Sequence, residues 1–231
     1  MRTSIGRVLL VALVCAGVAV YADQQPPQAQ AAAQAPAAPQ APRKPLSPAG
    51  TAATQVGGKW VPSDKPGAPP RYQDGKWIEV AYSRPILRGR QEIFGTGAEY
   101  GKAVSGGDPV WRAGANQTTR FTTEAPLAFG GKTLPAGEYS LFVDLKPGAW
   151  TLIFSKQPFQ QKYDPANKAQ TWGATNYDQA QDVLRVPMTV TTIPSSLDQF
   201  TIGFLDMTQQ GGKLGMWWEK TQATAEFTVG G

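Results

Sequence analysis

The chain has 231 residues, 17% of them charged, and its 22 Lys and Arg against 17 Asp and Glu give a net charge of +5, with no histidine at all. The absence of histidine excludes Ser-His-Asp and Cys-His catalysis, zinc sites built on imidazole, and the side chain best suited to proton transfer near neutral pH. A positive charge this small, with no clustered basic run, gives no reason to expect nucleic-acid binding.

Residues 1–22 have the pattern of a secretory signal peptide. Arg2 and Arg7 precede an apolar run over residues 8–20, and small residues then allow cleavage after Ala22. The run is shorter than the ~20 residues of a membrane-spanning helix, so we expect cleavage rather than a retained membrane anchor. The sequence therefore predicts a periplasmic or extracellular protein with no transmembrane segment after cleavage.

The single cysteine, Cys15, lies inside this apolar run and follows Val14. A lipid-acceptor cysteine normally follows a small residue, so we interpret Cys15 as an ordinary signal-peptide residue. After cleavage the mature chain would have no disulfide, no thiolate nucleophile and no cysteine metal ligand.

Residues 23–56 are predicted to form a disordered linker rich in Pro, Ala and Gln. Up to about Pro48 this stretch has almost no charge and almost no large apolar side chain, so burial cannot offset the entropy lost on ordering. Its prolines favour an extended spacer. The spacer either tethers the domain away from a membrane or wall, or is a solvated linker without a partner.

Residues 57–231 are predicted to form a single domain, because their composition is globular and their length is typical of one domain. Apolar residues alternate at period two between Gly- and Pro-rich turns, which indicates β-strands. The expected strands lie at about 59–61, 76–82, 139–145, 150–154, 183–190, 200–204, 214–218 and 225–229, and a Pro-rich loop at 62–70 joins the first two. The best helix candidate, residues 176–182, is barely two turns long.

This pattern of short strands and few helices predicts an all-β fold. We expect an antiparallel, jelly-roll-like β-sandwich, because several strands have bulky residues on both faces and paired sheets need well-filled inner faces. A small β-barrel is the alternative.

The segment from Tyr82 to Arg120 is the richest in polar and aromatic residues, and much of it has the composition of a loop. Arginine can form paired hydrogen bonds with an anion, and Trp or Tyr offers an apolar platform with a polar tip. The candidate binding residues are Arg84, Arg90, Trp111, Arg112 and Asn116. The structural alternative is that the arginines satisfy loop carbonyls while Trp111 closes the end of the sandwich.

Carboxylate chemistry is the catalytic possibility that remains. A glycan hydrolase needs two acids about 5–10 Å apart in one cleft, and Asp182 with Glu219, or with Glu79, is the candidate pair. No metal site and no cofactor are predicted, since no Asp-x-Asp-x-Asp-Gly loop occurs and the Gly95-Thr96-Gly97 stretch lacks the context of a phosphate-binding loop.

Several motifs in order resemble a bacterial family of exported proteins, domain of unknown function 2911. They are YSRP (82–85), WRAGAN (111–116), LPAGEYSLF (134–142), DVLRV (182–186) and WWEKT (217–221), and the resemblance covers about residues 77–229. It implies an exported β domain without an assigned activity. It singles out Ser83, Arg84, Arg90, Trp111, Arg112, Asn116, Asp182, Arg185 and Glu219. Many relatives have Glu where this chain has Gln117.

Three functions are compatible with these features. The first is a non-catalytic binding module for a small anionic, carbohydrate or cell-envelope ligand. The second is a carboxylate-dependent glycan hydrolase. The third is a structural or interaction protein without a small ligand, in which Arg84, Arg112, Asp182 and Glu219 would form buried ion pairs.

Overall fold

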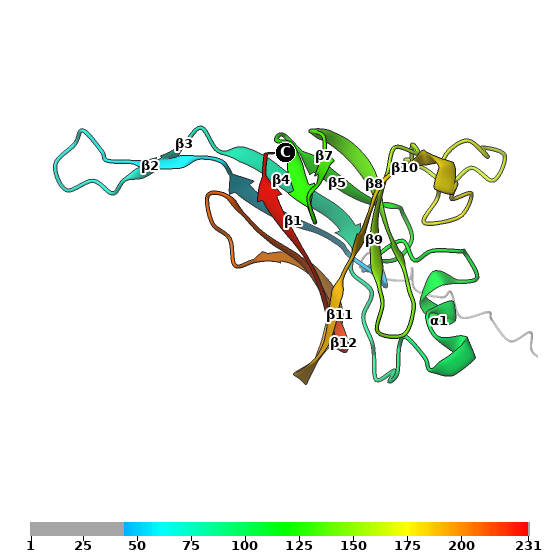
Figure 1. Cartoon of the computed structure of the whole chain (residues 1–231). Coiled ribbons are helices and arrows are strands. Elements are labelled where there is room, and N and C mark those ends of the chain that lie inside the picture. The colour runs from blue at the N-terminus through cyan, green and yellow to red at the C-terminus, as the bar shows by residue number, and fades with distance from the viewer. Residues whose placement is uncertain (1–43, 231) are drawn as a thin grey trace, which may run out of the picture. The chain divides into compact units, whose positions relative to one another are not determined.

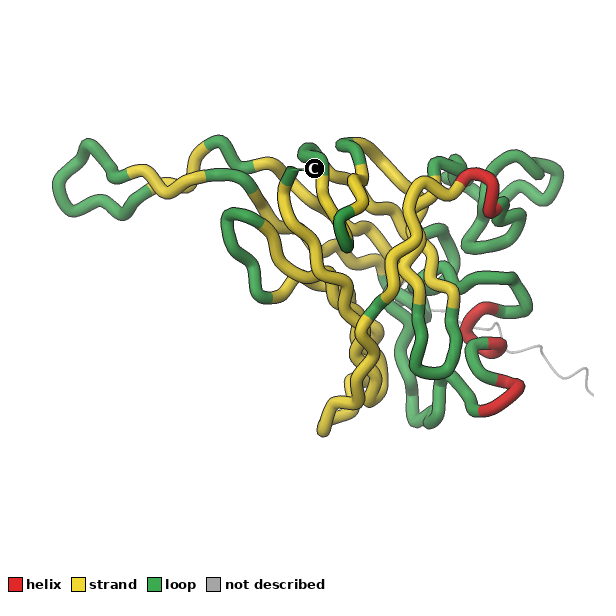
Figure 2. Tube along the Cα trace, viewed as in Figure 1, coloured by secondary structure: helices red, strands yellow, loops and turns green. Residues whose placement is uncertain are grey.

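The computed structural model describes residues 44–230, and the predicted signal peptide and most of the predicted linker lie outside this range. The described chain is made of antiparallel strands with a few very short helices (Figures 1 and 2). The larger sheet has the order β1 (Ala49–Val56), β4 (Lys76–Ser83), β5 (Thr119–Thr123), β8 (Gly137–Asp144), β9 (Thr151–Ser155), β10 (Asp182–Pro187). The smaller sheet has the order β11 (Thr189–Leu205), β12 (Gly211–Val229), β6 (Leu127–Phe129), β7 (Lys132–Leu134).

The prediction of an antiparallel β-sandwich is therefore confirmed, and the described residues do not form the alternative closed barrel. The helices are η1 (Gly97–Glu99), α1 (Lys102–Ser105) and η2 (Gln179–Gln181). The helix predicted at 176–182 is reduced to η2, whose first turn begins where the Asp178 carboxylate accepts the Ala180 N–H at 2.9 Å. No helix in residues 44–230 is long and apolar enough to cross a membrane.

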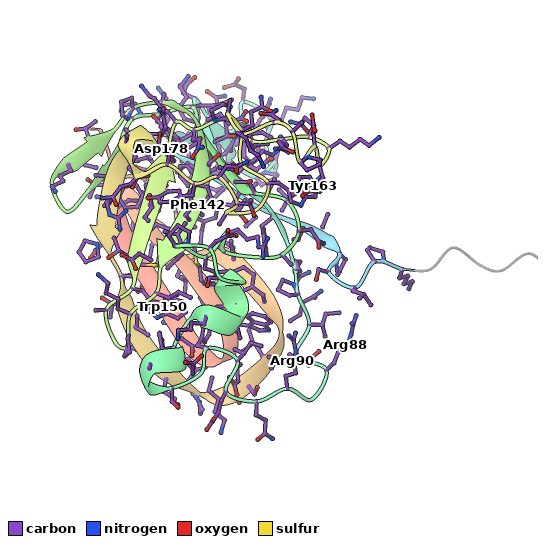
Figure 3. All side chains as sticks on the ribbon, turned by 90° about the vertical axis from the view of Figure 1, so that its right-hand side faces the viewer. Arg88, Arg90, Phe142, Trp150, Tyr163 and Asp178 are labelled. Atoms are coloured by element: carbon purple, nitrogen blue, oxygen red, sulfur yellow. The ribbon has the colours of Figure 1, made fainter. Side chains whose placement is uncertain are left out.

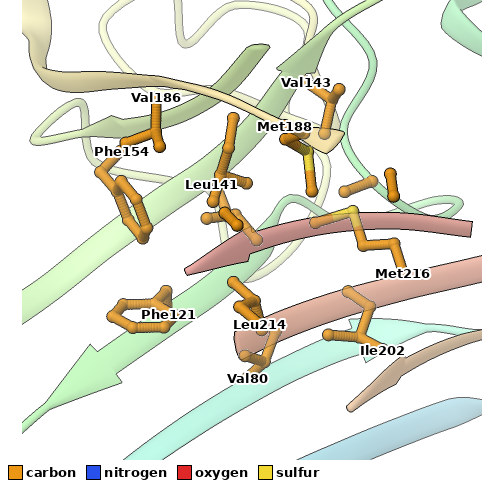
Figure 4. Packing of buried hydrophobic residues seen from close by; sticks show 14 of the residues in the cluster. Val80, Phe121, Leu141, Val143, Phe154, Val186, Met188, Ile202, Leu214 and Met216 are labelled. Atoms are coloured by element: carbon orange, nitrogen blue, oxygen red, sulfur yellow. The ribbon is translucent and has the colours of Figure 1, made fainter. Parts of the chain in front are cut away.

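The core lies between the two sheets. On β4, Ile78, Val80 and Tyr82 are buried while Trp77 and Glu79 are exposed, as the period-two pattern predicts. Figure 4 shows side chains of the larger sheet, such as Phe121 and Leu141, facing side chains of the smaller sheet, such as Leu214 and Met216. Each fully buried side chain of this kind contributes about 1.5–3 kcal/mol, so this interface stabilises the fold.

A second, smaller apolar cluster lies on the outer face of β8 and β9. Phe142 and Ile153 point away from the main core but are fully buried, because Val110 and Ala174 from long loops pack over them. These loops and short helices gather on one side of the sandwich (Figure 2). They hold most of the motif residues that the sequence singles out.

The predicted disordered linker ends earlier than residue 56. Ala49–Val56 forms the edge strand β1, which pairs with β4 along its whole length, from Ala49 opposite Ser83 to Val56 opposite Lys76. Backbone pairing holds this strand, and its small side chains give no strong sequence signal. Residues 49–56 therefore belong to the domain.

Strand β2 (Lys59–Val61) is confirmed, but its partner across the Pro-rich loop is β3 (Arg71–Gln73) and not the predicted strand at 76–82, which is β4 and pairs with β1 and β5. The β2–β3 ribbon projects from the sandwich as an arm (Figure 1). Trp60 on the arm is 62% exposed and meets the edge of the Tyr72 ring, with ring centroids 5.3 Å apart.

Candidate ligand-binding site

Trp111 lies at the centre of an aromatic cluster and is only 1% exposed. Its ring packs against Phe94, Trp150, Phe200 and Trp218, and its Nε1 donates to the Gly114 carbonyl at 3.2 Å. The backbone of Trp111 also pairs with that of Val143 on β8. This pairing holds the loop that begins at Trp111 against the sheet. Because both ring faces are covered, Trp111 builds the core and does not offer the stacking platform that the sequence suggested.

Arg84 follows β4 and lies against the edge strand. Its Nη2 donates to Thr201 Oγ1 at 3.4 Å, and its buried Nε has no hydrogen-bond partner within residues 44–230. A methyl group at Gly50 would collide with the aliphatic part of Arg84, so this glycine makes room for the side chain. Arg84 therefore links β1, β4 and β11 and is not paired with any acid in the described chain.

Arg88 and Arg90 lie in the turn after Arg84 and are both exposed; Figure 3 shows them side by side. Arg90 donates from Nε to the Leu87 carbonyl at 3.0 Å and from Nη2 to the Ile86 carbonyl at 2.8 Å, and its guanidinium lies 5.9 Å from the centre of the Trp218 ring. Arg88 donates from Nη2 to the Leu46 carbonyl at 3.0 Å.

These two arginines line one hollow of about 390 Å³, which we call the Arg88–Arg90 hollow. Its lining residues are Leu46, Ser47, Pro85, Ile86, Leu87, Arg88 and Arg90. No acidic side chain is among them. Asp198 lies nearby, where its carboxylate accepts the backbone N–H of Arg88 at 3.2 Å.

Glu219 shapes the loop that follows this hollow. One carboxylate oxygen accepts the Glu92 N–H at 2.8 Å and the other accepts the Ile93 N–H at 3.0 Å. Glu219 lies at a bulge in the β11–β12 pairing and has a left-handed backbone, with φ of 53°. A bulge re-aims a side chain, and here it directs the carboxylate at the loop.

Arg112 and Asn116 belong to a different loop cluster. Both residues lie close to Gly173. A methyl group added at Gly173 would collide with the Arg112 guanidinium and lie 3.0 Å from the Asn116 carbonyl oxygen. The Arg112 Nε is buried, and no described residue accepts a hydrogen bond from it. Burial lowers the pKa of Arg112, and the charge of Asp108 opposes this effect. Asn116 is exposed and has a left-handed backbone.

Asp182 belongs to a hydrogen-bonded network on β10. One of its oxygens accepts the Tyr177 hydroxyl at 2.6 Å and Arg185 Nη1 at 2.8 Å, while Arg185 Nη2 reaches Asp144 at 3.1 Å. The other oxygen of Asp182 is buried, and it receives no hydrogen bond from the part of the chain that the structure describes. Burial raises the pKa of the Tyr177 hydroxyl well above its ordinary value, and the hydrogen bond to Asp182 acts in the same direction.

This network predicts a loss of stability in alkali. The folded state holds the Tyr177 proton more tightly than the unfolded state, so its contribution is complete below the ordinary pKa of about 10 and is lost as the pH rises above it. We expect Tyr177→Phe to lower the free energy of unfolding at pH 7 by about 1–2 kcal/mol, because Asp182 loses a donor. Urea unfolding from pH 7 to 11 measures the difference in the free energy of unfolding between the wild type and Tyr177→Phe. This difference should become smaller above pH 10, and a difference that stays constant would contradict this account.

The structure therefore divides the sequence-predicted residues. Arg84 and Arg90 lie on either side of one turn, Arg112 and Asn116 lie in another cluster, and Trp111 is in the core. The acids Asp182 and Glu219 share no partner, since the first binds Tyr177 and Arg185 and the second binds backbone N–H groups. Arg88 was not among the candidates, although its place between two chosen arginines is a signal that could have found it.

A family of sequences described as "Protein of unknown function (DUF2911)" matches residues 70–227. The chain belongs to this family. The matched DUF2911 region runs from just before β3 to near the end of β12, so β1 and β2 precede it. No curated protein and no solved structure matches the chain. The DUF2911 description assigns no activity.

Proposed function

We propose that the protein is an exported, non-catalytic binding module that holds a small organic anion in the Arg88–Arg90 hollow. The observation that carries the proposal is that two guanidinium groups line this hollow and that no acidic side chain of the described residues does. The pattern of the first 22 residues supports export to the periplasm or the cell exterior.

The two arginines keep donors available for a ligand. A guanidinium has five N–H groups; Arg88 uses one of its Nη2 donors on Leu46, and Arg90 uses Nε and one Nη2 donor on its own turn. These contacts hold the guanidinium groups in place without neutralising them. A carboxylate, phosphate or sulfate group can accept the remaining N–H groups in paired hydrogen bonds.

The remainder of the lining is mostly apolar. Leu46, Pro85, Ile86 and Leu87 offer carbon surface beside the two charges. A ligand with an anionic group on a short apolar body matches both parts, as is usual for a small-molecule site. This includes a cell-envelope component that carries such a group.

Binding rather than catalysis is favoured by how the candidate pair Asp182 and Glu219 is used, and the third candidate, Glu79, stands on β4, four strands away from Asp182 on β10. Both carboxylate oxygens of Glu219 accept hydrogen bonds from loop N–H groups, and Asp182 accepts hydrogen bonds from Tyr177 and Arg185. A glycan hydrolase needs one acid free to give a proton and a second facing the same bond. Neither acid is placed for that task.

The test is calorimetric titration of the purified protein with hexyl phosphate, hexanoate and neutral hexanol. We expect both anions to bind and hexanol not to bind. Arg88→Gln keeps a polar side chain and removes its charge, so it should weaken anion binding about 10–100-fold, because a hydrogen bond to a charged group contributes about 1.5–3 kcal/mol.

Two matched variants control this experiment. Arg71→Gln changes an exposed arginine on the β3 arm and should bind as the wild type does. Arg112→Gln changes the partly buried arginine of the other loop cluster. If Arg112→Gln abolished binding while Arg88→Gln bound fully, the anion site would be the Arg112 cluster and the proposed site would be wrong. If neither anionic probe bound the wild type, the proposed function would be wrong.

A further inference from the structure

A second hollow lies on the outer face of the larger sheet and shares no lining residue with the Arg88–Arg90 hollow. It encloses about 460 Å³ and is lined by Ala53, Trp77, Glu79, Thr122 and Glu124, and we call it the Trp77 hollow. Trp77 is 49% exposed, on a strand whose opposite face carries Ile78, Val80 and Tyr82 into the core. A large aromatic ring left half-open in a concave site is available to stack on a ligand.

The strand register creates this hollow. Glu79 stands opposite Ala53 on one side and opposite Thr122 on the other, and these short side chains leave space around it. Trp77 and Glu124 are tied together, since Glu124 Oε2 accepts the Trp77 N–H at 2.8 Å and the Glu124 N–H donates to the Trp77 carbonyl at 2.9 Å. The lining is therefore fixed by the sheet.

The two carboxylates of the hollow lie near one another. Glu79 is diagonal to Glu124 across the β4–β5 pair, a relation that places residues about 7–8 Å apart. Glu124 keeps one oxygen free after accepting the Trp77 N–H. A single small ligand can therefore reach the indole ring and both carboxylates.

The charges on this face are not balanced within residues 44–230. Neither Glu79 nor Glu124 forms an ion pair there. Glu138, which stands opposite Thr122 on β8, forms none either. Arg120 shares the face, but its guanidinium lies over the Phe159 ring, 5.1 Å from the ring centre. Lys76 precedes Trp77 and alternates to the opposite side of the strand. The hollow is thus acidic in a chain whose net charge is +5.

We propose that the Trp77 hollow binds an organic cation, a ligand with an alkylammonium group. The carbon atoms next to the nitrogen would lie on the indole face, where a cation is attracted to the ring, and the positive charge would lie between Glu79 and Glu124. The charge of this ligand is opposite to that of the anion proposed for the Arg88–Arg90 hollow. The two sites can therefore be tested separately on the same protein.

The experiment is calorimetric titration of the purified protein at low salt with choline and with its neutral isostere, 3,3-dimethylbutan-1-ol. We expect choline to bind and the neutral alcohol not to bind, because the two differ only in charge. Trp77→Leu and Glu79→Gln should each weaken choline binding at least about fivefold, which corresponds to about 1 kcal/mol. Glu138→Gln, on the same face outside the hollow, should change it less than twofold.

Three results would overturn the proposal: no choline binding by the wild type, equal binding of the neutral alcohol, or full choline binding by Trp77→Leu. Binding of cellopentaose that depends on Trp77 but not on Glu79, without choline binding, would assign the hollow to a neutral glycan instead. Glu79→Gln changes only charge at an exposed position, so its melting temperature should match the wild type. Hexyl phosphate binding should be unchanged in every one of these variants.

Discussion

Trp111→Ala should reduce the free energy of unfolding by about 3–5 kcal/mol, the usual effect of truncating a large buried aromatic residue. The ring is 1% exposed and contacts four other aromatic side chains, so its removal leaves a cavity that rigid neighbours cannot fill. The Gly114 carbonyl also loses its donor. Urea unfolding followed by circular dichroism measures the change.

Trp60→Ala is the matched control for this variant, because Trp60 is 62% exposed on the β2–β3 arm. Its loss should lower the free energy of unfolding by less than about 1 kcal/mol. If the Trp111 and Trp60 variants were equally stable, Trp111 would not be the structural residue described above, and its availability to a ligand would have to be reconsidered.

Asp182→Ala should be the second large effect, a loss of about 2–4 kcal/mol in the free energy of unfolding. The carboxylate is only 7% exposed and accepts hydrogen bonds from both Tyr177 and Arg185. Its removal leaves a partly buried hydroxyl and guanidinium without their acceptor, and breaking a buried pair by removing one partner typically costs about 3–5 kcal/mol. The remaining contact of Arg185 with Asp144 reduces this penalty.

The control is Asp206→Ala, which removes an ion pair with Lys213 in which the carboxylate is 69% exposed. Exposed pairs contribute about 0–1 kcal/mol, so this variant should unfold almost as the wild type does. Equal urea midpoints for the Asp182 and Asp206 variants would show that the Tyr177–Asp182–Arg185 network does not stabilise the fold.

The all-β fold could be predicted because alternation of side chains reports burial directly. On β4, Ile78, Val80 and Tyr82 alternate with Trp77 and Glu79, whereas most residues of β8 and β9 are buried on both faces of the sheet. Strand β1 was not predicted, because its Ala, Thr and Gly residues show little alternation between apolar and polar side chains. Its stability comes from the pairing partner, which is a property of the whole fold.

The candidate site was harder to predict because proximity in sequence is not proximity in a loop-rich segment. Arg84, Arg90 and Arg112 are close in the chain, but each is held by a different part of the molecule. The role of Glu219 shows the reason most clearly, since its carboxylate binds N–H groups 126 and 127 positions earlier in the chain. Local composition carries no information about such contacts.

Strand β1 also determines where the domain can safely be cut. It covers the outer edge of β4, and a fragment that began at residue 57 would leave the backbone N–H and C=O groups of β4 that face β1 without partners. An exposed, unpaired edge is a template on which another chain can add a strand, so such a fragment would be prone to self-association. The strand next to the Pro/Ala/Gln-rich segment thus protects the sheet from joining its own copies.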